Sequence, residues 1–92
     1  MSVAIKYLAH NNTKNHDKIW GVIHTDAGAY SFWGRRGYTV AMKKLDDGDD
    51  GMHLYYKKLD KDYKAVPSNK ITALLPENFE QTLLLAILGQ HR

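Results

Sequence analysis

Strand-forming residues gather in three successive runs in the first half of the chain. The runs are "VAIKYLAH" (3–10), "IWGVIHT" (19–25) and "AYSFWG" (29–34), which are rich in β-branched and aromatic residues. The tripeptide "DAG" (26–28) is a turn signal between the second run and the third. Because such residues favour strands and a glycine-containing turn joins two of them, we predict strands here, with a hairpin around the turn.

The third run has a different role for each of its faces. Tyr30 and Phe32 alternate with Ser31 and Trp33, so one face can enter a core while the other presents Trp33. The run "YTVAMKKL" (38–45) alternates again, and one of its sides consists of Tyr38, Val40 and Met42. We therefore predict a further strand over this run.

An acidic run, "DDGDDG" (46–51), separates the predicted strands from a predicted helix. Its charges and its two glycines are incompatible with a buried regular element, so we expect a loop. After it the hydrophobic period becomes helical, and one helical face contains Met52, Tyr55, Tyr56, Leu59 and Tyr63. We predict that this face packs on the sheet, that Asp49 or Asp50 caps the helix or favours its dipole, and that three lysines lie away from the sheet, namely Lys57, Lys58 and Lys61.

The chain ends in a second predicted helix of unusual composition. A short extended exit, "YKAVPS" (63–68), leads to "LLPENFEQTLLLAILGQHR" (74–92), where Pro76 suits a first helical turn and Gly89 suits a stop. The apolar run 83–88 leaves this helix almost no polar face, so we expect burial against the sheet, with a homodimer through this helix as the alternative. The segment is too short for a membrane span.

Composition limits the architecture and the compartment. The chain has 92 residues, of which 43% are hydrophobic, enough for a single α+β domain over 1–92 and little more. It contains no cysteine, so disulfides and thiolate metal ligands are excluded. No secretory leader pattern opens the sequence, and we expect an intracellular, cytoplasmic location, associated with the nucleoid if the source is bacterial.

The positive charge is concentrated in the first half of the chain. Residues 1–44 contain seven Lys or Arg and two Asp, whereas residues 45–92 contain six Lys or Arg and eight acidic residues. The whole chain has a formal net charge of +3. A local basic excess attracts polyanions, and this attraction weakens with salt, although ordinary solubility charge is the alternative explanation.

The run "FWGRRG" (32–37) carries the candidate chemistry. An exposed Trp33 offers a flat surface to a sugar or base, and Arg35 offers forked donors to phosphate oxygens. The alternative interpretation is structural: Trp33 covers a small core, Gly34 and Gly37 form a bulge or bend, and the arginines are surface charge.

The wider pattern resembles the WGR domain family. The residues that carry the resemblance are "HDKIWGV" (16–22), "AYSFWGRRG" (29–37) and "LYYKKLDKDYKAV" (54–66), in this order and with a strand between the last two. The Trp-Gly-Arg motif is followed by a second glycine, and Lys18 opens the preceding strand as in the family. The resemblance covers about 3–66 and leaves 67–92 as a helical extension. It implies an antiparallel sheet with one helix packed on it, to which this chain adds the apolar C-terminal helix.

The family resemblance also implies a function. WGR domains of DNA-dependent poly(ADP-ribose) polymerases and of bacterial proteins are non-catalytic nucleic-acid-binding modules that meet a DNA end near its 5′ terminus. By analogy Trp33 stacks on the terminal sugar, Lys18 and Asn15 approach the end phosphate, and Arg35 serves DNA or a partner protein. Arg36 adds a nonspecific phosphate contact. We therefore expect a DNA-binding surface formed by Asn15, Lys18, Trp33, Gly34, Arg35, Arg36, Lys43 and Lys44. The acidic run 46–51 would repel DNA if it faced the same side.

Two other classes of function compete with DNA binding. A protein-interaction, adaptor or inhibitor module would use the same Trp-Arg surface or the C-terminal helix, since Trp and Arg are common interface anchors. An enzyme is not expected, because no serine or carboxylate pair has a catalytic context and the five histidines lack metal-ligand spacing. If an EF-hand loop began at Asp46, Gly48 and Lys57 would occupy its third and twelfth positions, where calcium ligands are needed. Neither residue has a side-chain oxygen, so calcium binding is not expected. No metal or cofactor is expected.

Overall fold

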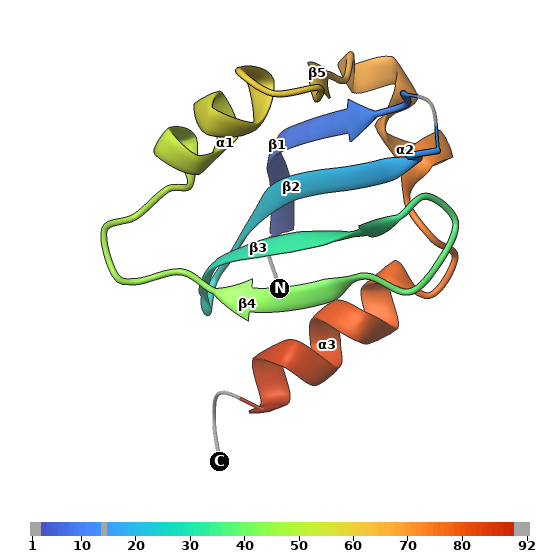
Figure 1. Cartoon of the computed structure of the whole chain (residues 1–92). Coiled ribbons are helices and arrows are strands. Elements are labelled where there is room, and N and C mark those ends of the chain that lie inside the picture. Colours follow the sequence, from blue (N-terminus) through green and yellow to red (C-terminus); the bar gives the residue numbers. More distant parts are fainter. Residues whose placement is uncertain (1–2, 14, 90–92) are drawn as a thin grey trace.

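A five-stranded antiparallel sheet forms the centre of the computed structural model, which describes residues 3–13 and 15–89 (Figure 1). The spatial strand order is β4-β3-β2-β1-β5. The strands are β1 (Val3–Asn11), β2 (Lys18–Thr25), β3 (Gly28–Arg35), β4 (Ala41–Lys44) and β5 (Lys64–Ala65). The helices are α1 (Met52–Leu59), a 3-10 turn η1 (Ser68–Lys70), α2 (Ile71–Leu74) and α3 (Phe79–Gly89). The expected α+β class with an antiparallel sheet is confirmed.

The strand register gives the sheet two distinct faces. In the β2–β3 ladder Trp20 is opposite Trp33, and Gly21 is opposite Phe32. Successive side chains alternate between the faces, so the two tryptophans lie on one face and Phe32 on the other. In β1 the register shifts between Ile5 and Tyr7, which marks a bulge. Ile5 therefore packs on the Phe32 side of the sheet and Tyr7 on the Trp20 side, although the two residues are only two positions apart.

Helix α1 covers one end of the tryptophan-bearing face. Its Tyr55 ring stacks on Tyr7 with centroids 4.6 Å apart and lies 6.5 Å from Trp20. Trp20, Val22 and Leu45 form the buried part of this cluster. Since α1 contacts β1 and β5, it leaves the β3–β4 side of this face uncovered (Figure 1).

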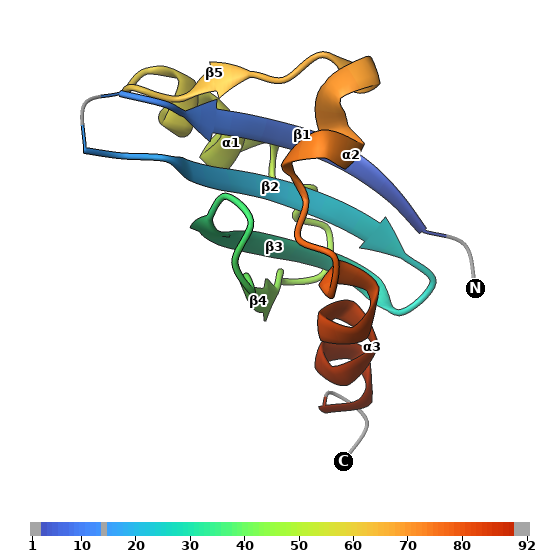
Figure 2. The same cartoon turned by 90° about the vertical axis from the view of Figure 1, so that its right-hand side faces the viewer.

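The two C-terminal helices cover the opposite face. Phe79, Leu83 and Ile87 recur every four residues in α3 and are buried against Phe32 and its neighbours. The rings of Phe32 and Phe79 meet edge to face at 4.9 Å. Figure 2 shows α3 below the β3–β4 side, with α2 beside β1 and β2. Residues 67–89 therefore contribute to the same core as the sheet.

Two glycines are required by the local structure, one by close packing between strands and the other by the backbone of a turn. A Cβ atom on Gly21 would lie 2.5 Å from Cζ of Phe32 and 2.6 Å from the carbonyl oxygen of Tyr7. Gly37 adopts a φ of +83° in the turn between β3 and β4, which other residues rarely adopt. The first glycine admits a buried ring, and the second reverses the chain.

Some predicted boundaries are wrong. Of the strand predicted over 38–45, only β4 (41–44) is formed. The amide of Tyr38 donates to the carbonyl of Arg35 in the turn, so pairing with β3 begins only at Ala41. Helix α1 ends at Leu59, before Tyr63, and Met52 and Tyr56 are exposed rather than packed on the sheet.

The C-terminal segment differs from its predicted boundaries as well. Helix α3 begins at Phe79, one turn later than Pro76 suggested, because Pro76 accepts the amide of Phe79 in a preceding turn. The turn η1 and helix α2 were not predicted. The predicted burial of α3 holds for one side only, since Leu84, Leu85 and Leu88 are exposed.

Candidate nucleic-acid interface

The aromatic and basic residues of the motif lie on one face of the sheet. Lys18 is opposite Arg35 in the β2–β3 register, and Trp33 lies two positions before Arg35. Lys43 is opposite Ser31, which is two positions before Trp33. Side chains two positions apart in a strand point to the same side, so these groups share a face. All four are exposed, and we call them the Trp33 face: Lys18, Trp33, Arg35 and Lys43.

The sheet holds Trp33 in place while leaving its ring accessible. Its side chain is 40% exposed, whereas Trp20, directly opposite, is 5% exposed under α1. The strand β3 lies between β2 and β4, which fixes the backbone of Trp33 on both sides. A flat ring on a rigid strand suits stacking, because little conformational entropy is lost when a ligand binds.

Arg35 is oriented by the turn that follows it. Its guanidinium carbon lies 5.7 Å from the centroid of the Tyr38 ring, a cation–π distance. The amide of Tyr38 donates to the carbonyl of Arg35 at 3.0 Å, and the left-handed Gly37 closes the turn. Tyr38 supports one face of the guanidinium, and no side chain among the described residues forms a hydrogen bond with its N–H edges, which can therefore donate to a phosphate.

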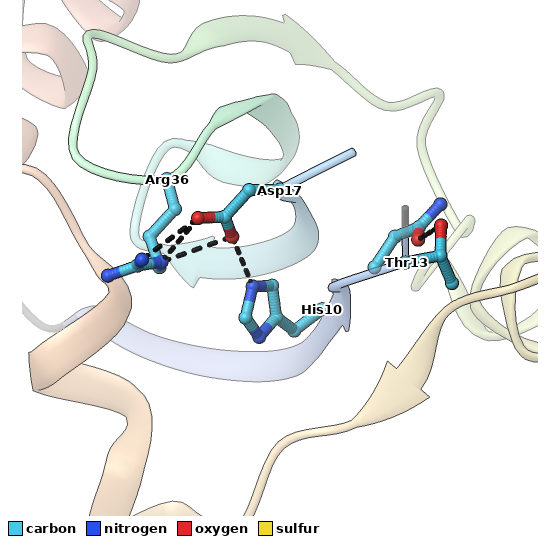
Figure 3. Close-up of polar contacts among 5 residues, drawn as sticks. His10, Thr13, Asp17 and Arg36 are labelled. Atoms are coloured by element: carbon cyan, nitrogen blue, oxygen red, sulfur yellow. Dashed lines mark hydrogen bonds and ion pairs between the residues drawn. The ribbon is translucent and has the colours of Figure 1, made fainter. Parts of the chain in front are cut away.

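Arg36 is engaged elsewhere, in a cluster with Asp17 and His10 (Figure 3). Its Nε lies 2.9 Å from Oδ2 of Asp17, and the Nε2–H of His10 donates to Oδ1 of Asp17 at 2.6 Å. The hydrogen bond from Arg36 is the largest cause that holds the pKa of Asp17 below its ordinary value, and the hydrogen bond from His10 is the next. In turn, the hydrogen bond to Asp17 raises the pKa of Arg36. The charge of Arg36 is therefore compensated, and this residue is not part of the Trp33 face.

Three further predicted residues have other positions. Lys44 is opposite Tyr30, on the α3 side of the sheet, with Nζ 3.7 Å from Oδ1 of Asp47. Asn15 is exposed in the loop between β1 and β2 with a φ of +68°. A Cβ on Gly34 would lie 3.3 Å from Cα of Val40, so this glycine serves the packing of the β3–β4 turn.

The acidic loop lies at the far end of the strands. Residues 46–50 line a hollow with His24, Gly28 and Lys44, near the start of β3. Arg35 ends β3, and at the usual rise per residue it lies about 23 Å further along the strand than Gly28. Oδ1 of Asp50 accepts the amide of Met52 at 2.9 Å and supports the start of α1. The loop therefore does not oppose a polyanion at the Lys18–Arg35 end.

Sequence reasoning missed the groups that support this end of the sheet. The hydroxyl of Thr13 donates to Oδ1 of the buried Asn11 at 2.8 Å, and Asn11 is opposite Lys18 in the β1–β2 ladder. Asp17 and Tyr38 were also missed. Asp17 meets His10 and Arg36 only in the folded chain, whereas the short spacing of Arg35 and Tyr38 around Gly37 is visible in the sequence.

Comparison of the chain with protein-family models, curated proteins and solved structures finds no match. Among residues 3–13 and 15–89, no group of three or more His, Asp or Glu side chains could hold a metal ion. In the same part of the chain, no helix combines the length and apolar character needed to cross a bilayer.

Proposed function

We propose that the chain is a non-catalytic module that binds the ends of duplex DNA through the Trp33 face. The observation that carries the proposal is the alignment of Trp33, Arg35 and Lys18 on one exposed face. The nearest acidic side chain in sequence, Asp17, is already paired with Arg36 and His10. An exposed ring flanked by two cations fits a sugar or base beside a phosphate.

The preference for the end of a duplex follows from the flat ring of Trp33. Inside a duplex the base faces are covered by their neighbours, whereas a terminal base pair or sugar leaves a surface on which Trp33 can stack. Stacking of this kind contributes about 1–3 kcal/mol per base. Lys18 and Arg35 then bind the terminal phosphates, in agreement with the resemblance of the motif to WGR domains.

Fluorescence anisotropy tests the proposal. A labelled duplex with one open, 5′-phosphorylated end is compared with a closed dumbbell of the same stem, over a series of salt concentrations. We expect tighter binding of the open end, weakening with salt, and a loss of about tenfold in affinity for Trp33→Ala. Lys44→Gln is the matched control and should bind as the original chain does. Equal affinity for both DNAs would reject end recognition, and no binding at low salt would reject the proposal.

A protein-interaction role is the second candidate, favoured by the outer side of α3. Leu84, Leu85 and Leu88 are exposed on this helix, and Leu85 is 70% exposed. Adjacent exposed leucines of this kind are typical of protein interfaces. Sedimentation of the chain alone and of Leu85→Glu tests a homodimer through α3: a dimer that this change dissociates supports it, and a monomer at high concentration rejects it.

A further inference from the structure

A separate pocket lies at the other edge of the sheet from β3 and β4. Its volume is about 550 Å³, and it is an open pocket lined by the end of β1, strand β5 and the η1–α2 turn. This volume is within the usual range for small-molecule sites. Strands β1 and β2 separate it from β3, so it is distinct from the Trp33 face.

The wall of the pocket is apolar. β5 and its exit supply Ala65, Val66 and Pro67, and α2 supplies Ala73 and Leu74. Val66 and Leu74 also pack against the main core, and the amide of Val66 donates to the carbonyl of Leu8 at 3.0 Å. The apolar wall is therefore attached to the sheet and is formed before any ligand binds.

Among the described residues, the charged side chains of the pocket are mainly cationic. Lys64 and Lys70 line it together with one acidic residue, Asp62, and the neutral polar residues Asn12 and Thr13. His10 also lines it, and because Nε2 of His10 is held by Asp17, Nδ1 is the ring nitrogen left for a ligand. The charge of Asp17 is compensated by Arg36 outside the pocket wall, so the lining carries a positive excess.

An apolar wall with a cationic rim selects a particular ligand chemistry. We propose that this pocket binds a small amphipathic carboxylate, with its hydrocarbon chain against Val66 and Leu74 and its carboxylate between Lys64 and Lys70. Ammonium head groups meet like charge at the two lysines. A short carboxylate without a hydrocarbon chain leaves the apolar wall unused.

Amide chemical shifts of the full chain can locate the binding. Sodium hexanoate is the probe, acetate tests the head group alone, and hexylammonium tests the chain with the opposite charge. We expect hexanoate to produce saturable shifts at Ala65, Val66 and Lys70. Its half-saturating concentration should be at least about tenfold lower than that of acetate or hexylammonium.

Two variants and their controls link the binding to the pocket. Ala73→Trp fills the pocket from an exposed position, and Lys70→Glu reverses a rim charge; each should weaken hexanoate at least about tenfold. Thr72→Trp, on the same turn but outside the lining, and Lys57→Glu, on α1, should leave the affinity unchanged.

Three results would overturn the assignment. These are hexanoate shifts that map to the exposed leucines of α3, equal affinity for hexanoate and hexylammonium, and the absence of saturation. Trp33→Ala should retain hexanoate binding, so failure of DNA binding and failure of this pocket are distinguished by separate experiments.

Discussion

Trp20 and Trp33 are directly opposite each other in the β2–β3 ladder and share one face, yet one is buried and the other is exposed. The difference comes from α1, whose Tyr55 packs against Trp20. Two identical side chains in one register pair thus have different roles. Trp20 belongs to the core, and Trp33 is available to a ligand.

Alanine at each position should separate these roles. Trp20→Ala leaves a cavity beneath Tyr55 and should lower the free energy of unfolding by about 3–5 kcal/mol. Trp33→Ala removes a ring that is partly in water and should cost about 1 kcal/mol. Urea titration followed by circular dichroism measures both. Equal losses would contradict the assignment of Trp33 to a binding surface.

The salt dependence of DNA binding should depend on two specific cations. The double change Lys18→Gln and Arg35→Gln should reduce the slope of log K against log salt by about 2, because two phosphate contacts are lost. Anisotropy titrations at several salt concentrations measure this slope. A control double change, Lys44→Gln and Lys70→Gln, removes the same charge away from the Trp33 face. If both pairs reduce the slope equally, binding follows net charge and the face has no special role.

The Asp17 cluster should give stability a defined dependence on pH. The pKa of Asp17 is lowered in the folded chain, so its contribution is present above the unfolded pKa of about 3.9 and is lost as pH falls through the lower folded value. Asp17→Asn should therefore be less stable than the original chain at pH 7, and the difference should shrink below about pH 4. Thermal unfolding from pH 2 to pH 7 measures it. A difference that is constant over this range would show that the ion pair is not its cause.

The hydroxyl of Tyr30 is buried without a hydrogen-bond partner among the described residues. Tyr30 is fully buried beside Phe32 in the core. Replacing it by Phe removes an unsatisfied polar group and keeps the ring, so Tyr30→Phe should raise the free energy of unfolding by about 1 kcal/mol. Denaturant unfolding tests this, with Tyr38→Phe, at an exposed position, as the matched control. A clear loss of stability in Tyr30→Phe alone would indicate that the hydroxyl is satisfied in solution.

The sequence was informative where a local rule operates. The turn at 26–28, the strands before and after it, and the loop at 46–51 follow from turn residues, β-branched residues and charge, and the structure has them. The helix after Gly51 was also predicted, and its inward face was predicted in part. Tyr55 packs against Tyr7 and Trp20 as expected, whereas Met52 and Tyr56, which fit the same helical period, are exposed.

The candidate site was only partly accessible to sequence reasoning. The alternation of side chains in β3 correctly placed Trp33 away from the core. The same alternation predicts that adjacent residues of a strand point to opposite faces of the sheet. Lys43 and Lys44 were nevertheless grouped, as were Arg35 and Arg36, and in each pair only the first lies on the Trp33 face. The pairing of Arg36 with Asp17 depends on tertiary contacts between residues far apart in the chain.

The bulge in β1 has a consequence for the behaviour of the protein at high concentration. Strand β5 pairs with β1 only at Ala9 and His10, so the earlier part of β1 lies at an edge of the sheet. A long, flat edge would template the addition of strands from other molecules and so promote aggregation. The register shift around Lys6 interrupts that edge with a kink and a positive charge. One inserted residue thereby helps to keep a strand-rich surface from growing into a fibril.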